Sequence, residues 1–302
     1  MRILVLGAGA TGGYFGGRLA GAGRDVTFLV RPQRAAVLAE RGLRINGPEG
    51  TLTVAPRLIT EVDGAYDVVL LAVKSYGLDA ALAGIGPAIG PRTVVIPLLN
   101  GVRHLDTLVA AFGPERAWGG VCMIHATLDE WGDVVRMTGL HRLAYGPLDG
   151  GPDDRLDAVT AALSGAGFDS RASRDIVAEL WEKWVLLATM GSATTLMRGS
   201  IGAINASPGG PEFLHALMAE VIAVATAAGH APRERAVGMV QGAISTTEPT
   251  TSSLYRDLIA GLPIEADSIV GDMVAEAAKH AVGVPLLAAA YTALSVHTAS
   301  RA

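Results

Sequence analysis

Hydrophobic and polar positions follow two different patterns in the two halves of the chain. In the first half, short β-branched runs alternate with segments of helical periodicity. The runs DVVLLAV (67–73) and TVVIPLL (93–99) stay apolar after their first residue, as strands do when helices cover both faces of a sheet. Further strands are expected at 2–6 and 25–30, a strand or hairpin arm at 51–59, and a helix at 12–23. Strand–helix alternation of this kind predicts an α/β fold with a doubly wound parallel sheet.

The second half is different, because its apolar positions recur at helical spacing throughout. Short Gly- and Pro-containing stretches separate five expected helices, at 175–197, 211–229, 233–246, 264–282 and 286–299. The pattern therefore predicts two domains. Residues 1–174 form the α/β domain, and residues 175–302 form an all-helical domain.

Composition narrows the class of protein. With 50% hydrophobic and 18% charged residues, the 302-residue chain is far too apolar for disorder. A net charge of −5 without a basic run argues against nucleic acid as a partner. A single cysteine, Cys122, excludes an internal disulfide framework and fits a buried strand position. No signal peptide is expected, and the longest apolar stretch, 184–197, is too short to span a membrane, so a cytoplasmic protein is predicted.

The sequence GAGATG at 7–12 matches G-x-G-x-x-G between a predicted strand and a predicted helix. Gly7 suits a tight turn, Gly9 lets the backbone approach a pyrophosphate, and Gly12 lets the helix pack closely on the strand. The helix N-terminus then presents free N–H groups to phosphates. The pattern predicts a dinucleotide-binding loop, whose remaining members are Ala8, Ala10 and Thr11.

Cofactor preference is indicated by the residue that ends the second predicted strand. An NAD site usually has a carboxylate there, on the ribose 2′-hydroxyl, whereas this chain has Arg31 followed by Pro32, Gln33 and Arg34. A guanidinium binds a 2′-phosphate in a bidentate manner, so Arg31 favours NADP. The alternative is a solvated cation at the end of a strand.

Two more polar residues follow predicted strands, at the sheet edge where open α/β sheets bind ligands. Lys74 follows the strand at 67–73 and could contact the adenosine phosphate side of a dinucleotide. Asn100 follows the strand at 93–99 and could reach the nicotinamide or the substrate. Each also has an ordinary interpretation, as a surface cation and as part of an Asn-Gly turn.

Lys183 is the last charge before an uncharged stretch that runs from Trp184 to Met197. An ammonium at the edge of an apolar helix can donate a proton to a developing alkoxide. The alternative is a surface ion pair with Glu179, worth about 0.3–0.5 kcal/mol. The 7 histidines show no metal-binding spacing, so no metal is predicted.

With these pieces assembled, the chain resembles the ketopantoate reductase (2-dehydropantoate 2-reductase) family over nearly its full length. The resemblance rests on the order and spacing of seven motifs: GAGATG, Arg31, VKS at 73–75, LLNG at 98–101, AELWEKW at 178–184, TSSLYRDL at 251–258 and PIEADSIVG at 263–271. It implies a Rossmann domain joined to a helical domain, NADPH bound in the cleft, reduction of a 2-keto acid, and a place in pantothenate synthesis. A homodimer is compatible with the apolar helical half.

The resemblance also implies roles for individual residues. Lys183 corresponds to the catalytic acid, and Glu265 to its acidic partner near the nicotinamide. Asn100 corresponds to an asparagine that contacts cofactor and substrate, and Ser253 to a serine that helps hold the substrate. Ala126 falls at a backbone position that lines the cofactor.

The chain departs from the family on the helical face of Lys183. Members have asparagines four and eight residues after the lysine, where this chain has Leu187 and Gly191. The loss of two amides predicts altered substrate selectivity and space beside Gly191 for a bulkier apolar group. Thr194, Thr195 and Arg198, on the next turns, are candidates to supply replacement polarity. A β-hydroxyacid-type dehydrogenase and a non-catalytic NADP(H)-binding sensor remain as alternative functions.

Overall fold

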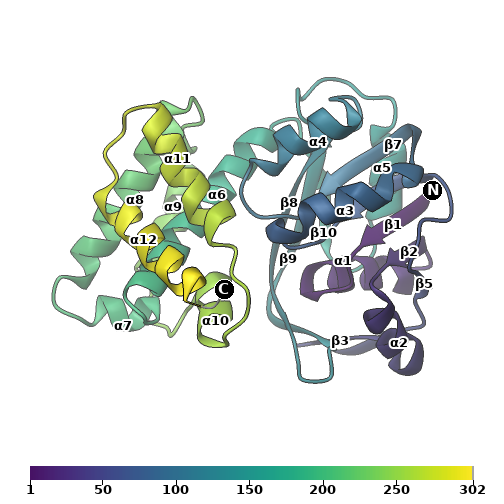
Figure 1. The fold of residues 1–302 in the computed structure, drawn as a ribbon, viewed down its shortest axis with the longest axis horizontal. Helices are drawn as coiled ribbons and strands as arrows, with labels where there is room; N and C mark the ends of the chain where they lie inside the picture. The colour runs from purple at the N-terminus through teal and green to yellow at the C-terminus, as the bar shows by residue number, and fades with distance from the viewer. Residues whose placement is uncertain (301–302) are drawn as a thin grey trace. The chain divides into compact units, whose positions relative to one another are not determined.

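The computed structural model describes residues 1–300 and divides the chain into two compact units (Figure 1). The first unit contains residues 1–99 and 104–177, and the second contains residues 100–103 and those from 178 onward. The long helix α6 begins next to the boundary, at Ile176. Residues 100–103, which the predicted boundary leaves in the first domain, cluster with the helical unit instead.

The first unit contains a five-stranded parallel sheet, sheet A, in the order β5-β2-β1-β6-β7. Its strands are β1 (Arg2–Leu6), β2 (Asp25–Leu29), β5 (Arg57–Ile59), β6 (Tyr66–Leu71) and β7 (Ile89–Pro97). One face packs on α1 (Ala10–Gly21), and the other packs on α3 (Leu78–Ile85) and α4 (His104–Phe112). Alternate residues of the central strand enter the two cores, with Val5 on one side and Leu4 on the other. The predicted doubly wound α/β fold is confirmed.

A second five-stranded sheet, sheet B, packs on α1 from the side away from sheet A. The long antiparallel pair β8 (Trp118–Leu128) and β9 (Val134–Pro147) is joined by β3 (Leu43–Gly47), β4 (Gly50–Val54) and β10 (Asp169–Ala172). The hairpin arm expected at 51–59 is therefore two strands, β4 and β5, that belong to different sheets. The remaining helices of this unit are α2 (Pro32–Arg41), α5 (Leu156–Leu163) and the 3₁₀ turns Ser75–Gly77 and Gly86–Ala88.

Among the residues that the structure describes, the second unit consists of helices and their connections, with no strand. Its helices are α6 (Ile176–Leu196), α7 (Ile201–Asn205), α8 (Gly210–Ala227), α9 (Glu234–Ile244), α10 (Ser253–Ile259), a π-helix at Asp267–Gly271, α11 (Asp272–Lys279) and α12 (Pro285–Ala299). Within residues 1–300, no helix is both long and apolar enough to cross a membrane.

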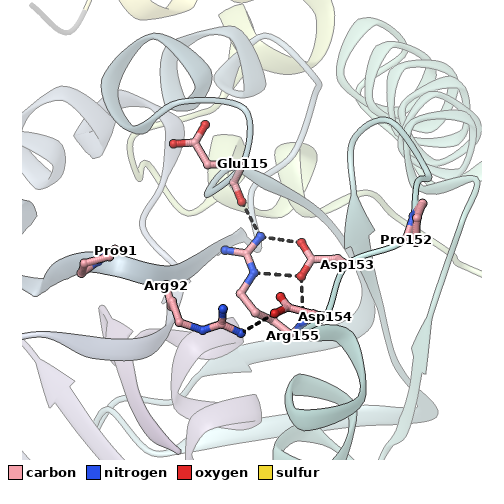
Figure 2. Close-up of a pocket in the computed structure, with 7 residues that line it drawn as sticks. All are labelled: Pro91, Arg92, Glu115, Pro152, Asp153, Asp154 and Arg155. Atoms are coloured by element: carbon pink, nitrogen blue, oxygen red, sulfur yellow. Dashed lines mark hydrogen bonds and ion pairs between the residues drawn. The ribbon is translucent and has the colours of Figure 1, made fainter.

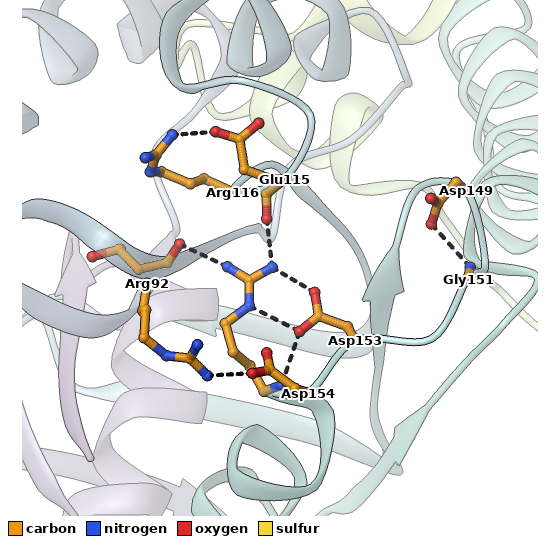
Figure 3. A network of polar contacts seen from close by, with 9 residues as sticks. Arg92, Glu115, Arg116, Asp149, Gly151, Asp153 and Asp154 are labelled. Carbon is orange, nitrogen blue, oxygen red and sulfur yellow. Dashed lines mark hydrogen bonds and ion pairs between the residues drawn. The ribbon is translucent and has the colours of Figure 1, made fainter.

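Charged residues tie α5 to the end of sheet A (Figure 2). Arg155, just before α5, donates to the carboxylate of Asp153 and to the backbone oxygens of Glu115 and Thr93. Arg92 pairs with Asp154 at 3.0 Å, and Arg116 pairs with Glu115 (Figure 3). The cavity of about 310 Å³ beside these residues is thus bordered by charges that already pair with one another.

Candidate active site

The glycine loop after β1 has the geometry that its spacing predicts. Gly7 has φ +96°, which only glycine adopts without strain, and a side chain at Gly12 would collide with the Gly7 carbonyl at 2.1 Å. At Gly9, by contrast, no atom lies within 4 Å of where a Cβ would stand. The first glycine is required by its backbone conformation and the third by packing, while the second leaves the backbone at the start of α1 open to an approaching group.

Arg31 and Lys74 lie at the same sheet edge as this loop. Leu6 at the end of β1 pairs with Leu29 of β2 and Leu71 of β6, so the carboxyl ends of the three strands coincide. Arg31 is the exposed residue that precedes α2, and Lys74 is the exposed residue that precedes a 3₁₀ turn. Both side chains begin at the carboxyl-end edge of the sheet, the edge at which open α/β sheets bind ligands.

Arg34 contacts the glycine loop itself, a role that the sequence did not reveal. Its Nε and Nη2 donate to the Ala8 carbonyl at 3.2 and 3.0 Å, and Nη2 also donates to the Gly132 carbonyl at 2.8 Å. Burial lowers the pKa of this guanidinium below its usual value, although Asp133 opposes that effect. The available signal was helical spacing, since Arg34 follows Arg31 by three residues at the start of α2.

Ala126 lies in β8 beside an irregularity in the β8–β9 ladder. The register shifts between Ile124 and Ala126, where Ala126 pairs with Arg136. Ala126 is half-buried against the core that also contains α1. A bulge at this point turns the strand locally, which is a common feature near binding sites.

The candidate catalytic residues Lys183, Glu265 and Asn100 all belong to the helical unit. Lys183 of α6 is 7% exposed and Glu265 is 5% exposed, so both charged groups are buried. Asn100 Nδ2 donates to Glu265 Oε2 at 3.3 Å. Gly101 has φ +78°, and a Cβ there would stand 2.4 Å from the Ser268 carbonyl. The short segment 100–103 therefore packs closely on the residues that follow Glu265.

A tryptophan next to the lysine fixes α6 against the same segment. The Trp184 indole Nε1 donates to the Ile269 carbonyl at 2.9 Å, and the side chain is almost fully buried. Ile269 lies four residues after Glu265, within the π-helix. One hydrogen bond thus joins the neighbour of Lys183 to the turn that carries Glu265.

The space expected beside Gly191 is not open, which corrects the expectation of room for a bulkier group. A Cβ at Gly191 would stand 3.3 Å from Leu254 Cδ2 and 3.6 Å from Ile269 Cγ2. Leu254 from α10 fills the volume that a side chain would take. Leu187, one turn earlier on α6, is only partly buried.

The two threonines considered as polar replacements are already bonded within α6. Thr194 Oγ1 donates to the Met190 carbonyl at 2.7 Å, and Thr195 Oγ1 donates to the Gly191 carbonyl at 2.7 Å. Thr194 also contacts Ser252 Oγ at 2.7 Å, and that serine caps α10 by accepting from Tyr255 N. Ser253 is the half-buried first residue of α10.

Comparison with known proteins identifies the family. Residues 3–150 match the family described as ketopantoate reductase PanE/ApbA, and residues 175–298 match its C-terminal part. The chain belongs to the ketopantoate reductase family. It is accordingly a member of a family of oxidoreductases, and its parallel sheet and helical second unit are those of the family's fold.

Relatives within the ketopantoate reductase family extend over the whole chain. An uncharacterized oxidoreductase, YkpB of Bacillus subtilis (strain 168), is 34% identical over 100% of both chains. A 2-dehydropantoate 2-reductase of Halobacterium salinarum is 30% identical over 95% of both. Among solved structures, a 2-dehydropantoate 2-reductase from Geobacter metallireducens GS-15 has a TM-score of 0.88 at 27% identity, covering 98% of this chain and 99% of the other. A D-mandelate dehydrogenase solved with NADH and anilino(oxo)acetate shares the fold, with a TM-score of 0.88 at 22% identity and 99% coverage of both chains.

Proposed function

We propose that this protein is an NADPH-dependent reductase that converts a 2-keto acid to the corresponding 2-hydroxy acid. The observation that carries the proposal is that a lysine and a glutamate are both buried in the helical unit of a ketopantoate reductase family member. Lys183 and Glu265 are both buried, and Asn100 donates to Glu265. A buried cation and a buried carboxylate are costly to maintain, which favours a chemical role for them.

The residues around the glycine loop fit a dinucleotide. The open backbone at Gly9 and the free N–H groups at the start of α1 suit a pyrophosphate. Arg34 is bonded to the Ala8 and Gly132 carbonyls, so Arg31 is the arginine of this pair assigned to the 2′-phosphate that distinguishes NADPH from NADH. When bound, the reduced nicotinamide supplies the hydride.

In the proposed mechanism, Lys183 donates a proton from Nζ to the carbonyl oxygen while the carbonyl carbon accepts the hydride. The product is a 2-hydroxy acid, and the neutral amine takes a proton back from solvent. Glu265 orients the ammonium, and the Asn100 amide holds the Glu265 carboxylate in place. The lysine thereby stabilises negative charge on oxygen as that charge develops.

The substrate is proposed to lack a hydroxyl group at the position where family members use asparagines. Leu187 offers no hydrogen bond there, and the hydroxyl protons of Thr194 and Thr195 go to carbonyls of their own helix. A substrate hydroxyl buried without a partner costs about 1–3 kcal/mol, or roughly 5- to 150-fold in kcat/KM. Ketopantoate should therefore be a poor substrate.

The test is a panel of 2-keto acids with NADPH and with NADH, followed at the nicotinamide absorbance. We expect turnover with NADPH and a higher kcat/KM for keto acids without the ketopantoate hydroxyl. A clear preference for ketopantoate would mean that this protein reduces ketopantoate, and the proposed change of substrate would be wrong. Tight NADPH binding without turnover on any keto acid would favour a sensor, and faster oxidation of 3-hydroxy acids would favour a β-hydroxyacid-type dehydrogenase.

A further inference from the structure

A second cavity of the first unit lies between α1 and sheet B, apart from the glycine loop. Its volume is about 130 Å³, several times the roughly 30 Å³ that one water takes in the liquid. Tyr14 and Arg18 line it from α1, Thr51 from β4 and Arg136 from β9, and Glu49 lines it from the turn between β3 and β4. A small polar molecule would fit.

The charges in this cavity are unequally buried. The Arg136 side chain is 2% exposed, whereas its partner Glu49 is 67% exposed on the hairpin turn. Arg136 donates one further hydrogen bond, to the Thr138 carbonyl. A buried guanidinium requires an anion beside it. Here that anion is the exposed Glu49 side chain. Because water already solvates most of this side chain, its carboxylate can move away from Arg136 without losing solvation.

The surroundings of this ion pair are positive. Arg18 also borders the cavity, and its guanidinium donates to the Ala166 and Gly167 carbonyls, so it has no carboxylate partner of its own among these bonds. Tyr14 Oη lies 2.5 Å from His141 Nδ1. Burial, and then the charge of Arg136, lower the pKa of His141 below its usual value, which disfavours the charged ring. With Glu49 displaced, the cavity would carry two positive charges and no negative one.

Space is left open next to the carboxylate because position 47 is a glycine. A Cβ at Gly47 would stand 3.2 Å from Glu49 Oε2 and 3.5 Å from Arg136 Nε and Nη2. The φ angle of Gly47 is not positive, so backbone conformation does not require glycine here. A methyl group at this position would intrude on the place where the anion sits.

We propose that this cavity is a binding site for a small free carboxylate, which takes the place of the Glu49 carboxylate against Arg136. The Glu49 side chain marks the position and the chemistry of the ligand, since its carboxylate already occupies the site. All residues of the site belong to the first unit and lie outside the proposed catalytic group. The proposal therefore stands or fails separately from the reductase activity.

The test follows the amide NMR signals of Gly47, Gly50 and Thr51 in the full chain during titration with sodium acetate. Sodium chloride at equal ionic strength is the reference. Saturable shifts are expected with acetate in the natural protein. Glu49→Gln should lower the apparent dissociation constant about tenfold, because acetate no longer competes with an internal carboxylate. Glu61→Gln removes an exposed carboxylate elsewhere in the same unit and should leave the titration unchanged.

Gly47→Ala keeps every charge and should abolish the saturable response. This variant decides the question on its own if Glu49→Gln fails to fold. Equal responses to acetate and chloride, or unaltered acetate binding by Gly47→Ala, would overturn the proposal. Tighter binding of inorganic phosphate than of acetate in a parallel titration would overturn the assignment of the ligand as a carboxylate.

Discussion

At the scale of single residues, the proposed proton transfer and the proposed choice of cofactor each rest on a side chain, and the surroundings of the two side chains differ sharply. Lys183 is buried in the helical unit, whereas Arg31 is exposed at the edge of sheet A. The first should matter for the chemical step and the second for the choice of cofactor. Each role makes a separate prediction.

Replacing Lys183 with alanine should lower kcat by about 10²–10⁴-fold, because the variant lacks the proposed proton donor. NADPH affinity should stay nearly unchanged, since the donor acts in the transition state. Steady-state kinetics and calorimetric titration measure the two quantities. The matched control is Lys279→Ala, which removes an exposed lysine paired with Glu276. If Lys183→Ala had the kcat of the natural protein, Lys183 would not be the proton donor, and the alternative of an ion pair with Glu179 would be favoured.

Arg31 and Arg34 should affect cofactor binding in different ways. Arg31→Ala should weaken NADPH by about 1.5–3 kcal/mol and leave NADH almost unaffected, because only NADPH has the 2′-phosphate. Arg34→Ala should weaken both cofactors to the same extent, since it frees the Ala8 carbonyl and loosens the glycine loop. Titration calorimetry with both nucleotides measures this. If Arg31→Ala lost the same binding free energy for NADPH and NADH, Arg31 would not be the residue that binds the 2′-phosphate.

At the scale of helices and strands, the hydrogen bond between α6 and the π-helix is the feature with the clearest consequence. Trp184→Phe keeps an aromatic ring but removes the donor to the Ile269 carbonyl. The loss should let Lys183 and Glu265 drift relative to each other, so kcat should fall about ten- to a hundredfold, with NADPH affinity unchanged.

Trp181→Phe is the matched control for this prediction. Trp181 is buried in the same helix and packs on both Trp184 and His230, with ring centroids 4.9 and 4.6 Å away, but it is not the donor to the π-helix. We expect this variant to lose stability without losing kcat. Equal losses of kcat in the two variants would mean that the effect comes from general loosening of α6.

Much of this element structure could be predicted from the sequence, and the exceptions have physical causes. The five long helices have apolar residues at helical spacing, and the central strands are continuous apolar runs. Their predicted bounds therefore differ from those in the structure by only a few residues. Of sheet B, the sequence predicts only β4, as part of the arm at 51–59, and a strand position at Cys122. The long strand β9 is not predicted because it is buried at both ends and exposed in the middle, which matches neither helical nor alternating spacing. The π-helix has no periodicity of its own to detect.

The candidate site was predictable to a lesser degree. The glycine loop, Lys183 and Glu265 stand in motifs, whereas Arg34 acts through backbone carbonyls, which no sequence pattern records. Thr194 and Thr195 are candidates for replacement polarity because their side chains are polar. Their hydroxyls bond the preceding turn of α6, as threonines inside helices commonly do.

At the scale of the whole molecule, acid should destabilise the protein partly through Asp153. Hydrogen bonds from Arg155, which outweigh the effect of burial, hold the pKa of Asp153 below its usual value. The carboxylate therefore contributes its full stabilisation above the unfolded-state pKa of about 3.9, and that contribution is lost as the pH falls through the lower folded-state pKa.

Asp153→Asn should lower the free energy of unfolding by about 1–3 kcal/mol at pH 7, because Arg155 loses a charged partner. The difference from the natural protein should shrink below pH about 4 and vanish at lower pH. Urea unfolding at pH 7, 5, 4 and 3, monitored by circular dichroism, measures the gap. A difference that stays constant over this range would show that the charge of Asp153 does not stabilise the fold.

The assignment of residues 100–103 to the helical unit also limits how such proteins can recombine. A single crossover in the gene at codon 177 would join the first part of one parent to the helices of another. Asn100 would then come from one parent and Glu265 from the other, and Gly101 would meet a foreign Ser268 carbonyl. Functional chimeras should therefore need a double exchange, which transfers codons 100–103 together with the helical half. Libraries of chimeras with a single crossover should yield mostly folded but inactive proteins.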